Sequence, residues 1–172
     1  FLRFAFGITA LTLVYMSLMA LRDLRDNYVA DIFKELNYDG GAMIFTWTEV
    51  PVAIIVLAIA ASLMLIRHNL LAFMPHHVLI LAGSLILGLA TFLFQAGALS
   101  PPVWMALTGL GLYMGLVPIN CILFDRLIAV FRTAATAAFL IQVGDSFGYL
   151  TSVGVLLYKN FGEANIRWLD YF

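Results

Sequence analysis

Four polar side chains recur at helical spacing within an apolar run near the end of the sequence. They are Gln142, Asp145, Ser146 and Tyr149, which would share one face of an α-helix. A carboxylate in the middle of such a run is costly in lipid, so it commonly marks an ion path, a proton relay or a substrate site. The alternative is a hydrogen-bonded clamp that only fastens neighbouring helices. Asp145 is therefore the first candidate for a proton, cation or substrate site, and the other three are its expected polar neighbours.

Two other polar residues lie in apolar runs beside prolines. Glu49 precedes Pro51 near the start of its run, and it is either a carboxylate beside a cavity or, as we slightly favour, a residue at the membrane boundary. Asn120 follows Pro118, whose ring frees a backbone carbonyl and commonly kinks a helix. Asn120 would then either satisfy the freed group or face a cavity.

Residues that bind metals or attack substrates are sparse. His68, His76 and His77 lie in one link without an acidic partner, so we expect no metal site there. Cys121 is the one cysteine, which excludes a disulfide scaffold and a cysteine-rich metal centre. The sequence contains no phosphate-binding loop, nucleophile elbow or zinc-protease motif. We therefore expect neither an enzyme nor a cofactor-binding protein.

The composition indicates what surrounds these residues. Of the 172 residues, 63% are hydrophobic and only 11% are charged, against about 45–50% and about 25% in soluble domains. Nine Lys and Arg against ten Asp and Glu give a net charge of −1, which leaves no basic surface for nucleic acid. The expected partner is the lipid bilayer.

Five apolar runs are long enough to cross a bilayer, which takes roughly 20 helical residues. We therefore predict an all-α, polytopic transmembrane bundle over residues 1–172, with about five spans at residues 4–21, 42–66, 78–99, 102–124 and 133–158. The charged link at residues 22–41 reads as the first helix extended beyond the membrane, with a stop at Gly40-Gly41. The distribution of Lys and Arg weakly favours a cytoplasmic N-terminus.

Small residues at four-residue spacing predict close helix packing. The pairs are Gly144 with Gly148, Gly111 with Gly115, and Ser84 with Gly88. Such pairs let helix backbones approach closely. We expect them to serve packing within the chain, with dimerisation as the weaker alternative.

Several stretches resemble an uncharacterised, domain-of-unknown-function family of major-facilitator-like bacterial inner-membrane proteins. They are LRDLRDNYVADIF (21–33), TWTEVPVAIIVL (46–57), GLGLYMGLVPINCILFDRLIAVF (109–131) and GDSFGYLTSVGVLLYKNFG (144–162). The facilitator fold joins two six-helix halves, each built of inverted three-helix repeats. The resemblance implies that the five runs match the first five helices of the C-terminal half, that the chain is part of a longer protein, and that it lies in the bacterial inner membrane. It implies no substrate.

One signature of that superfamily is missing. Many facilitators carry Gly-x-x-x-Asp-Arg between the second and third helices of a half. Here the corresponding link, residues 67–77, lacks it, and an Asp125-Arg126 pair follows the fourth run instead. This departure leaves room for a relative that does not transport.

Two functions from different classes follow. The first is a secondary transporter that moves a small solute by alternating access, with Asp145 as the proton- or cation-linked carboxylate. Asn120 and the polar stripe would surround Asp145, Glu49 would be a second candidate, and Asp125 with Arg126 would form an inner-side gate or ion pair. The second is a non-transporting membrane subunit or scaffold. Its glycine pairs would dock partner helices, and residues 22–41 would contact a partner outside the cytoplasm.

Overall fold

The computed structural model describes residues 5–38, 43–66, 69–123, 126, 128–129 and 137–161. Within these ranges the chain is helical and contains no strand, so the prediction of an all-α protein is confirmed. The elements are α1 (Ala5–Glu35), α2 (Met43–Met64), α3 (Asn69–Gln95), α4 (Pro101–Pro118), the π-helix η2 (Ile119–Leu123) and α6 (Ala137–Phe161).

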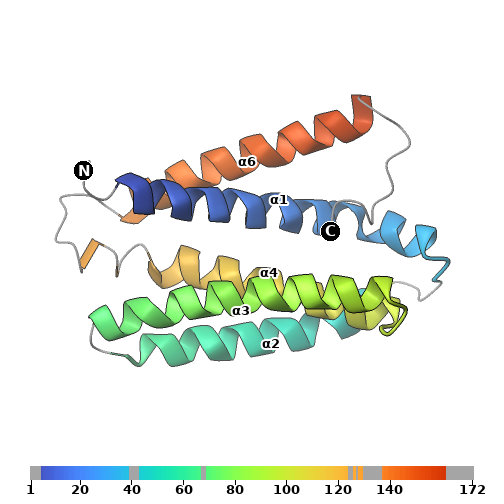
Figure 1. Ribbon diagram of the computed structural model, residues 1–172, viewed down its shortest axis with the longest axis horizontal. Helices are drawn as coiled ribbons and strands as arrows, with labels where there is room; N and C mark the ends of the chain where they lie inside the picture. Colours follow the sequence, from blue (N-terminus) through green and yellow to red (C-terminus); the bar gives the residue numbers. More distant parts are fainter. Residues whose placement is uncertain are drawn as a thin grey trace.

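The long helices form two groups (Figure 1). α1 and α6 lie side by side, whereas α2, α3 and α4 pack together as the second group. α4 joins the groups, because it packs against α1 as well as against α2 and α3. In contrast, the backbones of α1 and α2 hardly meet in the part of the chain that the structure describes.

Local sequence explains where α1 and α3 end. Beyond α1, Asn37 takes the left-handed conformation (φ 52°), and the amides of Asn37 and Tyr38 donate to the carbonyls of Lys34 and Phe33. This is a Schellman ending, completed by contact between the Phe33 and Tyr38 rings. Gly97 (φ 74°) ends α3 in the same way. The extension of α1 is therefore observed, but Asn37 supplies its stop; the predicted stop at Gly40-Gly41 lies outside the described residues.

Prolines shape the fourth run. Pro101 and Pro102 occupy the first turn of α4, where a missing backbone N–H costs nothing. Pro118 ends α4, and the chain continues as η2 rather than as a simple kinked α-helix. Because proline removes one i→i−4 hydrogen bond, the wider π-helical register after it is a natural local outcome.

Two helices are long and apolar enough to cross a membrane, by length and composition, among the described residues. They are Thr46–Met64 of α2 and Phe73–Gln95 of α3. Only 28% and 17% of these windows are buried inside the structure, so most of their apolar side chains face outward. These two helices are the structural indication of a membrane protein; the prediction of five spans stays a prediction.

The predicted link at residues 67–77 is wrong for most of its length. α3 begins at Asn69 and includes Pro75, His76 and His77. Pro75 lies inside the helix, where it removes one i→i−4 backbone hydrogen bond without ending α3. The third apolar run therefore lies in a longer helix than its hydropathy alone indicated.

Three clusters of buried side chains hold the bundle. The first joins α1 to α4 and η2, and includes Tyr15, Leu18, Leu112 and Ile119. The second packs the far end of α1 against α3 and α4 through Ile32, Phe33, Ala90, Trp104 and Met105. The third joins α2 to α4 through Val52, Val56 and Met114. The second cluster shows that the charged extension of α1 packs against α3 and α4 of the same chain.

Candidate functional site

Asp145 is paired with a tyrosine on α1. The Tyr15 hydroxyl donates a hydrogen bond to Oδ1 of Asp145, and the Tyr15 side chain itself is buried. Asn120 of η2 lies next to the same hydroxyl, and its Oδ1 atom is buried with no hydrogen-bond partner among the described residues. Three helices, α1, α6 and η2, thus bring a phenol, a carboxylate and an amide together. We call Tyr15, Asn120 and Asp145 the carboxylate site.

Glycine makes this approach possible. A Cβ atom added at Gly144 would lie 3.0 Å from Cδ1 and 3.2 Å from Cε1 of Tyr15. One added at Gly148 would lie 2.8 Å from Cγ of Met19. At both glycines, α1 side chains fill the space that a Cβ atom would take. Tyr15 can therefore reach the carboxylate of Asp145, which follows Gly144.

The rest of the predicted polar stripe does not gather around Asp145. Ser146 Oγ donates to the backbone carbonyl of Gln142, 2.7 Å away on its own helix. Gln142, Ser146 and Tyr149 are exposed. They lie on an outward part of α6, while Asp145 turns toward α1. The neighbours of the carboxylate are thus Tyr15, which the sequence reading missed, and Asn120, which it named.

A second polar cluster surrounds Arg25, whose side chain is only 2% exposed. Its guanidinium forms an ion pair with Glu49 of α2 through Nη2, and Nη1 lies 2.9 Å from Asp26 Oδ1. Nη2 also donates to the Met105 carbonyl at 3.0 Å. The Tyr113 hydroxyl donates to the other oxygen of Asp26 at 3.0 Å. We call Arg25, Asp26, Glu49 and Tyr113 the arginine cluster.

Gly109 leaves room for the guanidinium of Arg25, because it has no side chain. A Cβ atom at this position would lie 2.7 Å from Nη2 and 3.0 Å from Cζ of Arg25. Only a residue without a side chain lets the buried cation lie flat against α4 at this point. The cluster therefore depends on three helices. α1 supplies the Arg25 cation, α2 supplies the Glu49 carboxylate, and α4 supplies the Met105 carbonyl and the space left by Gly109.

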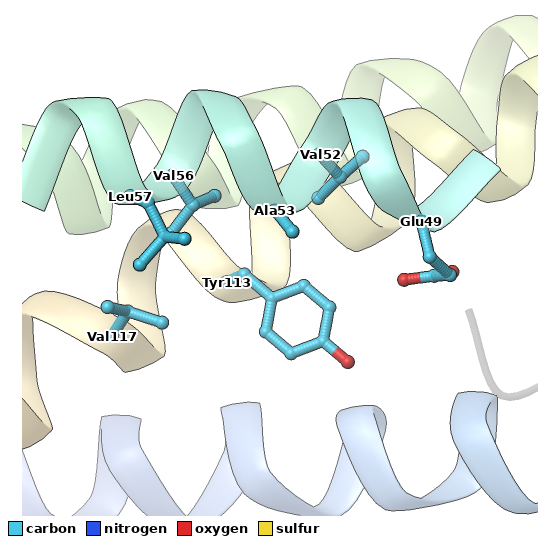
Figure 2. Close-up of a pocket in the computed structure, with 7 residues that line it drawn as sticks. All are labelled: Glu49, Val52, Ala53, Val56, Leu57, Tyr113 and Val117. Atoms are coloured by element: carbon cyan, nitrogen blue, oxygen red, sulfur yellow. The ribbon is translucent and has the colours of Figure 1, made fainter. Parts of the chain in front are cut away.

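A pocket of about 330 Å³ adjoins the arginine cluster (Figure 2). Glu49 and the Tyr113 hydroxyl both point toward α1 at one end of it. The remaining lining is aliphatic and comes from α2 and α4: Val52, Ala53, Val56, Leu57 and Val117. Glu49, predicted as a boundary residue or as a carboxylate beside a cavity, is thus both ion-paired and part of a pocket wall.

The other predicted residues serve packing or lie elsewhere. A Cβ at Gly111 would come within 3.0 Å of the Leu87 amide, and one at Gly115 within 2.8 Å of Leu18 Cδ1. Gly88, by contrast, faces open space. Arg126 donates to the Ile66 carbonyl at 3.1 Å, near the end of α2, whereas Asp125 lies outside the described residues. In the described ranges no three His, Cys, Asp or Glu side chains gather as metal ligands.

Arg25 could have been found from the sequence. Leu11, Leu18, Arg25 and Ile32 follow one another at intervals of seven, which keeps them near one face of a helix. Leu18 and Ile32 are buried on either side of Arg25. An arginine that interrupts an apolar heptad pattern is a candidate for a buried cation, whereas the high charge of residues 22–41 suggested a solvated segment.

The fold and these two polar clusters define an all-helical protein with apolar helices suited to a membrane. The chain belongs to the family of unknown function DUF5690, whose model matches residues 1–172. The predicted resemblance to an uncharacterised family is therefore confirmed, while the likeness to the major facilitators stays a prediction. Neither the curated proteins nor the solved structures contain a match to this chain.

Proposed function

We propose that this protein is a secondary transporter of a small solute, major-facilitator-like and coupled to protons at Asp145. One observation carries the proposal: an acidic side chain within α6 is held by the Tyr15 hydroxyl in the contact between α1 and α6. Ionisable groups at such positions are rare in membrane bundles and usually serve ion or substrate paths. The setting we propose is the bacterial inner membrane, with several spans and a cytoplasmic N-terminus.

The carboxylate site has the chemistry for a proton-dependent switch. An ionised Asp145 accepts the Tyr15 hydrogen bond, whereas a protonated carboxyl carries its own O–H donor. The Asn120 amide lies next to the Tyr15 hydroxyl and can donate a hydrogen bond to the phenol oxygen in either state. Proton binding at Asp145 would thus change the hydrogen bond that joins α1 to α6, beside a π-helical segment of a kind that is common at functional sites.

The two helix groups provide the moving parts that alternating access needs. α1 with α6 and α2 with α3 and α4 meet mainly where α1 packs on α4. A pocket that would accept a solute lies on the α1-facing side of α2 and α4. Rigid-body rocking of one helix group against another is the usual route by which such bundles expose a site alternately to each side.

The test is proton movement in proteoliposomes that contain a trapped pH-sensitive dye. A panel of amines, amino acids, organic acids and sugars is added outside, and the dye reports any proton flux that a solute evokes. We expect at least one solute to evoke flux with the wild-type protein and none to do so with Asp145→Asn. Asp31→Asn removes a carboxylate that is 52% exposed, and it should behave as wild type. Unchanged flux in Asp145→Asn would refute the coupling role.

A non-transporting subunit or scaffold is the second candidate. The observation that favours it is the large outward apolar surface of α2 and α3, which includes Trp47, Leu57, Leu81 and Leu85. A partner helix that packs on this surface would bury these exposed side chains. Purification in mild detergent separates the two: stoichiometric co-elution with defined membrane subunits supports a scaffold, whereas a particle of this protein alone supports the transporter.

A further inference from the structure

We infer that the pocket beside the arginine cluster binds a small hydrophobic monovalent cation, such as a protonated arylalkylamine or a quaternary ammonium compound. The inference rests on the proposed transport function, because it names the substrate class that this transporter would carry. Three features support this substrate class: the charge balance of the cluster, the lining of the pocket, and the way α1 and α2 meet.

Within the described part of the chain, the arginine cluster holds one more negative charge than positive charge. Arg25 contacts two carboxylates, Asp26 and Glu49, while the neighbouring Arg22 and Asp23 are paired with each other at 2.5 Å. The guanidinium is 2% exposed but both carboxylates are 40% exposed, so the excess charge lies on the open side of the cluster. A brace between helices needs one carboxylate for one guanidinium. The second carboxylate leaves room for one further positive charge.

The residues that line the pocket indicate the chemistry of the uncharged part of the ligand. Five aliphatic side chains cover most of the wall, and Glu49 is its single ionisable carboxylate. Such a surface offers too few hydrogen-bonding groups for a sugar or a nucleotide, and the charge disfavours anions. The Tyr113 ring lines the same space, and an aromatic ring attracts cations to its face. A volume of about 330 Å³ equals that of roughly eleven waters at ~30 Å³ each, which suits a ligand with one ring.

Glu49 also lies where a ligand could influence the helix groups. The backbones of α1 and α2 hardly meet among the described residues, but the Arg25–Glu49 ion pair joins them across the edge of the pocket. A cation that binds Glu49 would compete with Arg25 for this carboxylate. Ligand binding would therefore loosen the α1–α2 connection, which couples occupancy of the pocket to the relative position of the two groups.

The experiment is a binding titration with purified protein in lipid nanodiscs, with empty nanodiscs to correct for partitioning into lipid. The probe is benzyltrimethylammonium, and the comparison is neopentylbenzene, which has the same shape without the charge. We expect saturable binding of the cation, at least tenfold weaker binding of the uncharged isostere, and at least tenfold weaker cation binding by Glu49→Gln. Asp31→Asn is the matched control and should bind as wild type does.

A second variant keeps the inference testable should Glu49→Gln fail to fold. Ala53 lines the pocket yet is exposed, so Ala53→Phe fills the space without burying a new residue in the core, and it should abolish saturable binding. Equal binding of the cation and its isostere, or wild-type binding by Ala53→Phe, would overturn the inference. Asp145→Asn should keep cation binding while losing proton flux. Failure of the cation site thus differs from failure of proton coupling, which would spare binding.

Discussion

Replacing Gly109 by alanine is the sharpest test of the buried Arg25. The new Cβ would lie 2.7 Å from Nη2 and 3.0 Å from Cζ, well inside van der Waals contact. A flexible side chain normally moves aside at little cost. Arg25 is instead held by oxygens of Asp26, Glu49 and Met105, so any movement must lengthen at least one of these contacts.

The magnitude follows from two contributions. Overpacking in a well-filled site costs about 1–3 kcal/mol, and loss of a hydrogen bond to a charged group costs about 1.5–3 kcal/mol. Alanine itself is a better helix former than glycine by roughly 0.5–1 kcal/mol, which offsets part of the cost. We therefore expect Gly109→Ala to lower the free energy of unfolding by about 1.5–5.5 kcal/mol.

Gly88→Ala is the matched control, because a Cβ there meets nothing within 4 Å. It should raise the free energy of unfolding by roughly 0.5–1 kcal/mol. The assay follows loss of helical circular dichroism in mixed micelles as the fraction of denaturing detergent is increased. A double variant, Arg25→Met with Gly109→Ala, should show that the two changes are not additive, because the methionine has no guanidinium to displace. Equal stability of Gly109→Ala and Gly88→Ala would refute the reasoning.

Three further predictions concern stability, and the first two use the same unfolding assay. Tyr15→Phe removes the hydroxyl that donates to the carboxylate on α6 and should cost about 1.5–3 kcal/mol, whereas Tyr149→Phe, on an exposed side chain, should cost nothing measurable. Gly148→Ala should cost about 1–3 kcal/mol, because its Cβ meets α1 at 2.8 Å; Gly154→Ala faces open space, and an equal cost there would contradict this. Asn37→Ala should destabilise the end of α1 by roughly 1–2 kcal/mol, while Asn37→Gly should not, and amide hydrogen exchange at that end distinguishes them.

The sequence predicted the helices better than it predicted their ends. Long apolar runs with small residues imply helices whatever their neighbours, so the all-α architecture followed from composition and periodicity. The start of α3 was missed because Pro75, His76 and His77 lower the local hydropathy without breaking a helix. Hydropathy reports how a segment partitions into lipid, while backbone hydrogen bonding decides where a helix begins.

The candidate site was only partly predictable for a different reason. Spacing on one helix correctly places Gln142, Ser146 and Tyr149 near Asp145 along α6, but it cannot tell which of them faces a neighbouring helix. The partners Tyr15 and Asn120 lie 130 and 25 positions away in the chain. Contacts between such distant positions depend on how whole helices pack, which one sequence does not encode in any local pattern.

The length of α1 has a mechanical consequence. Tyr15 and Arg25 are ten residues apart on one uninterrupted helix, so about 15 Å of stiff rod separates them at 1.5 Å per residue. One end of this segment is tied to α6 and the other to α2. A rod cannot absorb a displacement by bending locally, so a tilt started at either attachment must appear at the other. α1 also contacts α4 along this length, at Leu18, Arg25 and Phe33, so a displacement of α1 would be passed on to α4 as well.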